Sequence, residues 1–260
     1  MIMTNKEILD IALKQSAVDC NCCPDDFLKN ENVIVISKKN KNARRYLDLA
    51  LPFDCDLVSY GNNVVASVSS EFKDIVSKYI DKYSVFRCFE TPNLLELDEE
   101  LQKSNFRVCH MAEYFLPDVE KLRAFTCNYE TLVLHNADFI DIYSPSWSNA
   151  LTSKNSKHDI IGIGAYDNGN LVGLAACSDD CESMYQIGVD VLPEYRRKGI
   201  ASALTSQLAL EILKVGKVPF YCAAWSNIKS VKNAIKCGFY PAWVEITAKS
   251  MEYVNKLLKY

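Results

Sequence analysis

The stretch IGVDVLPEYRRKGIAS, residues 187–202, combines a strand pattern, a basic loop and the start of a helix. Val189 and Val191 alternate with a small and a polar residue, as in a half-buried strand. Pro193 ends that strand because it has no N–H to donate to a ladder. Gly199 has no Cβ, so a ligand could approach its backbone closely. Three positive side chains precede the unpaired N–H groups of the helix's first turn, and together they predict an anion site.

The segment Arg196–Ala201 fits the pattern Arg/Gln-x-x-Gly-x-Gly/Ala. In this it resembles the pyrophosphate loop of the acyl-CoA-dependent N-acetyltransferases of the GNAT superfamily. Six residues alone are equally compatible with a solvated, positively charged helix start after a proline turn. A second motif, from Asn227 to Gly238-Phe239, is similar to the Asn-x-x-Ala…Gly-Phe signature of that family, with Ser230 in place of the small apolar residue. Two motifs at the right separation favour a GNAT domain.

The periodicity of the second half predicts a strand, helical turns, three strands, a helix, a strand, a helix and a last strand. This is the element order that the resemblance implies, with a mixed, mostly antiparallel sheet. Residues 32–116 show a similar order, including a helix over 40–50 and a strand over 85–89, but no phosphate loop. We therefore expect two α/β domains: residues 1–118, a degenerate GNAT-like repeat or an α/β cap of another fold, and residues 119–260, the GNAT domain.

Composition excludes several classes of protein. The 260 residues carry a net charge of −4 and a pI near 5.5, which argue against nucleic-acid binding and suit a cationic amine substrate. No apolar run approaches the roughly 20 residues of a membrane span. The first residues do not resemble a signal peptide, so the cytoplasm is the expected location. The sequence does not indicate an oligomeric state.

Eleven cysteines are present, several within apolar strand-like runs, where a free thiol behaves as a small buried hydrophobe. In a cytosol these thiols are expected to be reduced. Cys20, Cys22 and Cys23 form the only cluster in the sequence. It has no histidine nearby, so we expect a turn before Pro24 rather than a metal site, and no metal cofactor.

The GNAT resemblance implies roles for particular residues. The backbones of Val189, Asp190 and Val191 would pair with pantetheine, and a strand N–H near Val189 would polarise the thioester carbonyl. The N–H groups of residues 197–202 would hold the pyrophosphate, and Asn227 would bind the pantetheine arm. The expected acetyl-CoA-binding residues are Val189, Val191, Arg196, Arg197, Lys198, Gly199, Ile200, Ala201, Ser202, Asn227 and Asn233.

The sequence leaves the acid and the base of catalysis open. Many family members carry a tyrosine seven residues after the helix-starting Asn, and this chain has Ala234 there. Neither Asn233 nor Cys237 replaces a phenol, so water, Tyr185 or Tyr240 would protonate the thiolate. The carboxylate candidates for a general base are Asp190, Glu182 and Glu245. We select Asp190 as the catalytic residue because it lies in the strand that would bind the cofactor.

Together these features predict an acetyl-CoA-dependent N-acetyltransferase that moves acetyl directly to a primary amine. A small-molecule acceptor is expected; a protein N-terminus or lysine stays open. The alternative is a non-catalytic CoA-binding or regulatory protein with a GNAT fold, which Ala234 favours. A third possibility is that the basic loop binds another phosphate ligand, such as a nucleotide. The acceptor's identity and the role of the N-terminal half are not predicted.

Overall fold

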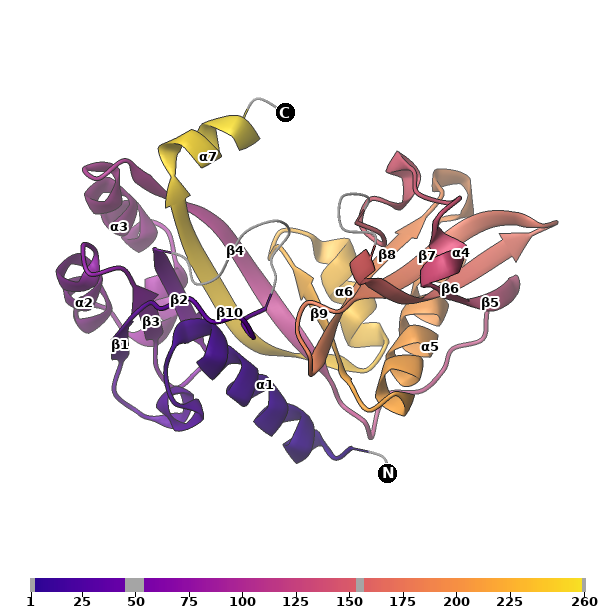
Figure 1. Cartoon of the computed structure of the whole chain (residues 1–260), viewed down its shortest axis with the longest axis horizontal. Helices are drawn as coiled ribbons and strands as arrows, with labels where there is room; N and C mark the ends of the chain where they lie inside the picture. The colour runs from indigo at the N-terminus through magenta and orange to yellow at the C-terminus, as the bar shows by residue number, and fades with distance from the viewer. Residues whose placement is uncertain (1–2, 45–53, 153–156, 259–260) are drawn as a thin grey trace. The chain divides into compact units, whose positions relative to one another are not determined.

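The structure is a computed structural model, and it describes residues 3–44, 54–152 and 157–258. The chain forms two compact units (Figure 1). Unit 1 comprises Met1–Ile11 and Tyr114–Pro241, and unit 2 comprises Ala12–Glu113 and Ala242–Tyr260. Most of the helix expected over 40–50 lies outside the described residues.

The two units are not consecutive pieces of the chain. Helix α1 (Asn5–Cys20), strand β4 (Phe106–Pro117) and strand β10 (Phe239–Ser250) each contribute residues to both units. Strands of 12 residues are long enough for their two ends to have different neighbours. The division at residues 118/119 therefore stays a prediction about domains, and the compact units differ from it at both long strands.

Unit 1 contains the mixed, mostly antiparallel sheet that the sequence predicts. Its strand order from β4 is β4-β9-β8-β7-β6-β5. Strands β5 to β8 pair antiparallel with their neighbours, and β8 and β9 pair in parallel. The strands are β5 (Glu130–His135), β6 (Asp159–Asp167), β7 (Asn170–Ser178), β8 (Met184–Val191) and β9 (Val218–Ala223).

The helices of unit 1 cover this sheet. They are α4 (Asn136–Phe139), α5 (Ile200–Lys214), α6 (Ile228–Lys236) and the 3-10 helices η3 (Pro145–Trp147) and η5 (Pro193–Tyr195). Helix α5 packs closely on the sheet at Gly173, where an added Cβ would lie 2.7 Å from Ile200 Cγ2. A second apolar cluster joins Phe139 and Trp147 to Leu174 and Ala176 of β7. The α5 and η3 segments therefore fix the position of β8 through the strand beside it.

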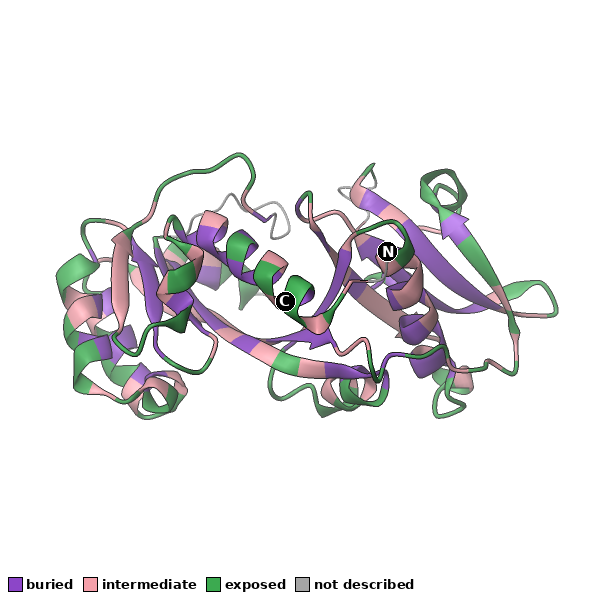
Figure 2. Cartoon of the chain, turned by 90° about the horizontal axis from the view of Figure 1, so that it is seen from below, coloured by how far each residue is buried: buried purple, intermediate pink, exposed green. Residues whose placement is uncertain are grey.

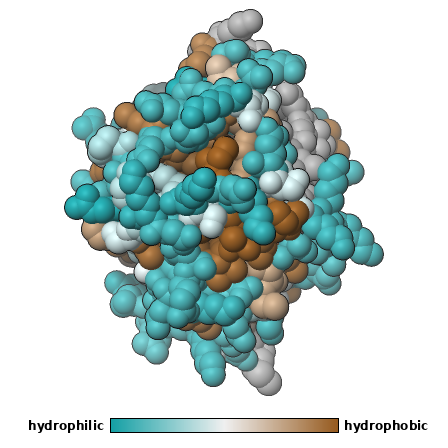
Figure 3. Space-filling model, turned by 90° about the vertical axis from the view of Figure 1, so that its left-hand side faces the viewer, coloured by the Kyte–Doolittle hydropathy of each residue, from teal (hydrophilic) through white to brown (hydrophobic). Residues whose placement is uncertain are grey.

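Unit 2 has the strand order β1-β3-β2-β10-β4. Its remaining elements are η1 (Pro24–Leu28), β1 (Val33–Ile36), β2 (Cys55–Ser59), β3 (Val65–Val68), α2 (Lys73–Lys82), η2 (Val85–Phe89), α3 (Asn93–Gln102) and α7 (Met251–Leu257). Strand β1 is parallel to β3, whereas β2 is antiparallel to both β3 and β10. Large apolar side chains of this unit, such as Phe86 and Leu95, are exposed. Figure 3 shows apolar patches among mostly hydrophilic side chains on the face beside α2 and α3.

The strand expected over residues 85–89 is wrong, because this segment is the 3-10 helix η2. Val85, Cys88 and Phe89 are the residues that pack against the core of unit 2, and their spacing is helical rather than alternating. Phe86 is 62% exposed, as the helical arrangement requires. With no strand at this place, the element order of unit 2 shares less with unit 1 than expected, and a degenerate GNAT-like repeat stays a prediction.

The sheet of unit 2 has chemically different faces. Leu57, Ala66 and Ile246 belong to the apolar cluster formed with α2 and α3. Because side chains alternate along strands, Asp56, Ser67 and the odd-numbered residues of β10 lie on the opposite face. Figure 2 shows buried residues along the central strands of each unit, whereas the helices carry buried, intermediate and exposed residues. Buried polar residues therefore occupy one face of this sheet.

All eleven cysteines are free thiols. Cys20 ends α1, and Cys22 and Cys23 form the link to η1, as the turn expected before Pro24 requires. None of the helices in the described part of the chain has the length and apolar character needed to cross a lipid bilayer.

Candidate functional site

Strands β8 and β9 separate partway along their length. Their parallel pairing runs from Met184 opposite Val218 to Ile187 opposite Tyr221 and ends there. Strand β8 nevertheless continues to Val191, where it is still paired with Gly173 of β7. The last residues of β8 therefore have a paired edge toward β7 and an open edge toward β9.

The backbone of Val189 faces the open edge. Leu192 N–H donates to Val172 C=O at 3.0 Å, so this pair is hydrogen-bonded. Hydrogen-bonded and non-hydrogen-bonded pairs alternate along an antiparallel ladder. Val189 and Val191 therefore direct their N–H and C=O groups away from β7. Such an edge can accept an added, strand-like ligand.

The loop after β8 delivers its backbone to the start of α5. Gly199 precedes the helix with φ +83°, and Arg197 also has a left-handed backbone with φ +63°. A Cβ on Gly199 would meet no atom within 4 Å, so the space beside it is open. The N–H groups of the first helical turn are directed toward this space.

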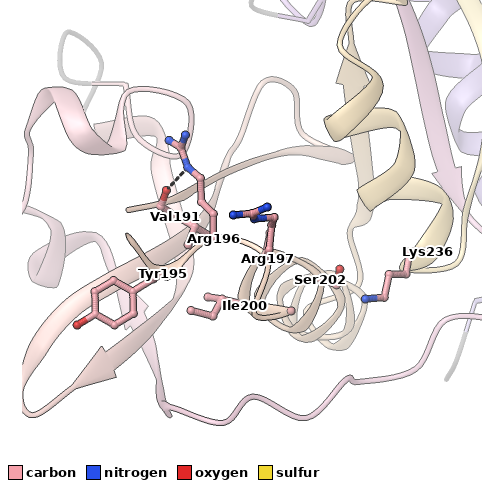
Figure 4. Close-up of a pocket in the computed structure, with 9 residues that line it drawn as sticks. Val191, Tyr195, Arg196, Arg197, Ile200, Ser202 and Lys236 are labelled. Atoms are coloured by element: carbon pink, nitrogen blue, oxygen red, sulfur yellow. Dashed lines mark hydrogen bonds between the residues drawn. The ribbon is translucent and has the colours of Figure 1, made fainter. Parts of the chain in front are cut away.

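A cavity of about 260 Å³ lies at this helix start (Figure 4). Figure 4 shows Arg197 beside the start of α5 and Lys236 extending from α6 toward Ser202. Its lining comprises Val191, Tyr195, Arg196, Arg197, Gly199, Ile200, Ala201, Ser202 and Lys236. Two arginines and a lysine beside open helical N–H groups suit a ligand with phosphate groups.

The three basic side chains of the loop do not act alike. Arg196 Nε donates to Val191 C=O at 2.9 Å and so holds the loop against the end of β8. Lys198 Nζ lies 3.2 Å from Tyr129 Oη and 4.7 Å from the ring centroid of Tyr195. Lys198 is not among the residues that line the cavity, and its ammonium group contacts the aromatic pair of Tyr129 and Tyr195 in a cation–π contact.

Lys236 and Tyr195 line the cavity although the sequence did not indicate them. Lys236 lies at the end of α6 and reaches the cavity because α6 packs beside α5. Only the tertiary packing brings this lysine to the start of α5. Tyr195 could have been predicted as a lining residue, because it directly precedes Arg196 of the basic loop.

Asn233 lies between α6 and α5, and cofactor binding by this residue stays a prediction. Its Oδ1 accepts a hydrogen bond from Ser202 Oγ at 3.0 Å, and its Nδ2 donates to Thr205 Oγ1 at 3.0 Å. The amide thus links α6 to α5 and holds Ser202 in the cavity wall, without itself lining the cavity. Asn227 Oδ1 accepts from Ser230 N–H at 3.3 Å and caps α6.

Asp190 is held by hydrogen bonds on the opposite side of β8 from α5. Its carboxylate accepts from Asn149 N–H at 2.8 Å, Asn149 Nδ2 at 2.6 Å and Ala150 N–H at 3.0 Å. A Cβ at Gly188 would lie 1.8 Å from Asn149 O, so only glycine allows this approach. The geometry favours Asp190 as a residue that positions the loop after η3.

The other candidates for the acid and the base of catalysis differ in their burial and in their partners. Glu182 is exposed, and Glu245 forms a buried ion pair with Arg44 in unit 2, 3.2 Å from Oε2 to Nη2. Burial raises the pKa of the Tyr185 and Tyr240 phenols. Ala234 is fully buried.

Tyr221 was missed at the sequence level. It lies in β9 where the pairing with β8 ends. Burial raises the pKa of its phenol, against the opposing effect of hydrogen bonding to Ser230 and Asn233 on α6. A tyrosine within a buried strand gives no signal of this position until α6 is placed.

Comparison with known proteins identifies the family. The family model described as GNAT acetyltransferase matches residues 62–242. A solved GNAT-family protein from Novosphingobium aromaticivorans is 18% identical, with a TM-score of 0.45, over 55% of this chain and 66% of that chain. A GNAT-family acetyltransferase from Colwellia psychrerythraea is 15% identical, with a TM-score of 0.45, over 79% of this chain and 84% of that chain.

An aminoglycoside N-acetyltransferase, AAC(6')-Iy, solved in complex with CoA, is 17% identical, with a TM-score of 0.35, over 44% of this chain and 92% of that chain. A search of curated proteins found no match. The family match covers well over half of the sequence. It begins at residue 62, far before the phosphate-loop motif at Arg196–Ala201. This chain belongs to the GNAT acetyltransferase family.

Proposed function

We propose that this chain binds acetyl-CoA and transfers the acetyl group directly to a primary amine of a small molecule. The observation that carries the proposal is the open edge of β8 at Val189, which leads into the cationic cavity at the start of α5. A strand-like thioester arm and a pyrophosphate are the two parts of a ligand that such an arrangement suits.

The cavity residues support binding of the phosphate end. The N–H groups at Gly199, Ile200 and Ala201 offer donors, and Arg197 and Lys236 add positive charge. Charge-assisted hydrogen bonds to phosphate are stronger than neutral ones. In this proposal Asn233 acts indirectly, because it orients Ser202 in the cavity wall.

The strand residues support binding of the reactive end. Acetyl-CoA would supply an acetyl group activated as a thioester. The N–H of Val189 faces the open edge and would donate to the oxygen that becomes negatively charged during transfer. Asp190 would keep the segment after η3 in place, since its carboxylate already accepts three hydrogen bonds from that segment.

The cytoplasm suits this activity. All eleven cysteines are free thiols, and several are buried in the core. Reduced thiols are typical of cytosolic proteins. The acidic character of the chain supports an acceptor with a positive charge.

A non-catalytic CoA-binding protein is the second candidate, and buried Ala234 favours it because a methyl group cannot donate a proton. The two are separated by incubating the chain with acetyl-CoA and a panel of small amines while following free thiol. Release of thiol that depends on an amine supports transfer. Binding of CoA, seen as a raised melting temperature, without thiol release across the panel supports the binding protein. Absence of CoA binding contradicts both.

A further inference from the structure

Three polar side chains form a row across the sheet of unit 2. Asp56 of β2 is directly opposite Ser67 of β3 and Thr247 of β10. Directly opposite residues have Cβ atoms about 4.5–5.5 Å apart and share a face of the sheet. The row is on the face opposite the apolar cluster of α2 and α3, so it faces the buried polar side of this unit.

Within the part of the chain that the structure describes, each side chain of the row has a buried oxygen without a hydrogen-bond partner. These atoms are Asp56 Oδ1, Ser67 Oγ and Thr247 Oγ1. The residues are only 3%, 0% and 5% exposed. Buried polar atoms almost always have a partner, because an unmet one loses its hydrogen bonds to water without compensation. Three unmet oxygens in one row therefore indicate a missing donor group.

Charged side chains surround the row. Arg44 forms ion pairs with both Asp19 and Glu245, and all three are buried. Lys249 is also buried, and its charge acts with that of Arg44 to lower the pKa of Asp56. Burial and then Glu245 raise this pKa more strongly, so that it lies well above its ordinary value. A cation placed against the Asp56 carboxyl group would oppose these two effects and favour its ionised form.

We propose that the row Ser67–Asp56–Thr247 is a binding site for the primary ammonium group of a small alkylamine. An ammonium group has three N–H donors and no acceptor, which matches one carboxylate and two hydroxyl oxygens. The site lies in unit 2 and does not depend on the proposed acetyl-CoA site.

The test is calorimetric titration of the whole chain with n-butylammonium chloride, with n-butanol as the neutral control. Saturable binding of the amine with one equivalent, and none of the alcohol, is expected. Asp56→Asn should abolish it, since an amide removes the charge. Ser67→Ala and Thr247→Val should each weaken it about tenfold, the usual effect of losing one hydrogen bond to a charged group.

Stability separates ligand binding from a structural role. Because the hydroxyls of Ser67 and Thr247 have no partner among the described residues, Ser67→Ala and Thr247→Val should leave the melting temperature unchanged or raise it. Ser59 is the matched control: its Oγ donates to Asn63 O at 2.6 Å and accepts from Gly61 N–H at 3.0 Å. Ser59→Ala should lower the melting temperature and leave amine binding intact.

Two results would overturn the proposal. One is the absence of saturable amine binding at millimolar concentration. The other is a melting temperature that falls as much in Ser67→Ala and Thr247→Val as in Ser59→Ala, which would mean that ordered water already occupies the row. Acetyl-CoA binding, measured on the same samples, reports separately on the proposed function.

Discussion

The carboxylate of Asp190 binds Asn149 twice, at the backbone N–H at 2.8 Å and at the side-chain amide at 2.6 Å. Gly188, two residues earlier on the same face of β8, lets the carbonyl of Asn149 come closer than any other side chain would allow. The strand that would bind the cofactor and the segment after η3 are therefore fixed to each other on this face, while α5 packs on the other.

Replacing Asp190 should make the segment after η3 more mobile without weakening acetyl-CoA binding. Asp190→Ala is expected to raise the acceptor KM about tenfold or more, because hydrogen bonds to a charged group are lost. The Kd of acetyl-CoA should stay within about twofold. Amide exchange of Asn149 and Ala150 should become faster, which hydrogen-exchange measurements can follow even without a known acceptor.

The pH–rate profile of Asp190→Asn distinguishes positioning from general-base catalysis. If Asp190 positions the segment, the acidic limb of the profile is retained. Loss of that limb with a fall in kcat of about 10²- to 10⁴-fold would mean that Asp190 is the base. Asp141→Asn, at an exposed position in the preceding segment, serves as the control and should change neither quantity.

Gly199→Ala and Gly169→Ala form a matched pair. Both glycines have left-handed backbones, φ +83° and +81°, and an added Cβ would meet nothing within 4 Å at either. Each substitution should lower the free energy of unfolding by about 1–2 kcal/mol, because L-residues disfavour this region. Only Gly199→Ala should also weaken CoA binding, since Gly199 lines the cavity. Equal CoA affinity in the two variants would contradict the proposal that the pyrophosphate binds at this helix start.

Lys236→Ala should weaken CoA binding about tenfold at low salt, through the loss of one charge-assisted contact. The effect should shrink as salt is added, because exposed charges are screened. Lys232 is exposed on the same helix but does not line the cavity, so Lys232→Ala is the control. If both lysines have the same small effect, the charge of Lys236 acts only at long range.

Lys249 should give the stability of the protein a distinctive dependence on pH. Burial lowers its pKa from 10.5 to about 8. Between these values the unfolded chain binds a proton that the folded chain does not, so this lysine's unfavourable contribution diminishes as pH rises. Below pH 8, where both states are protonated, Lys249→Met should be more stable than the parent by up to about 3 kcal/mol.

Denaturant unfolding of the two proteins across this range measures that difference. It should shrink steadily toward pH 10.5, and the ionisation of the cysteines, common to both proteins, cancels. Lys229→Met, at an exposed position, should show no such trend. A difference between Lys249→Met and the parent that is constant with pH would contradict the lowered pKa.

The basic loop and the helix start of the candidate site could be predicted from the sequence because their signals are local. Gly199, the basic residues before it and the apolar helix after it are neighbours in sequence, and helix starts follow short-range rules. The strand pattern at Val189 and Val191 was equally local. The family match confirmed the GNAT assignment that these residues suggested.

The remaining features depend on contacts between distant residues. Lys236 reaches the cavity only through the packing of α6, and Asp190 meets Asn149 only when the segment after η3 folds onto β8. The row in unit 2 requires Thr247 of β10 to pair with Asp56 of β2. At residues 85–89, a run of apolar residues was too short to distinguish a strand from a helical turn.

The sharing of β10 between the units has a consequence for how the protein is made. Residues from Ala242 onward belong to unit 2, yet a ribosome adds them after all of unit 1. Until they emerge, β2 has β3 as an antiparallel neighbour but lacks β10 on its other edge. Such an open strand edge is a template for wrong partners. Unit 2 can therefore complete its sheet only after all of unit 1 has been synthesised, and this edge of β2 stays open to wrong partners until then.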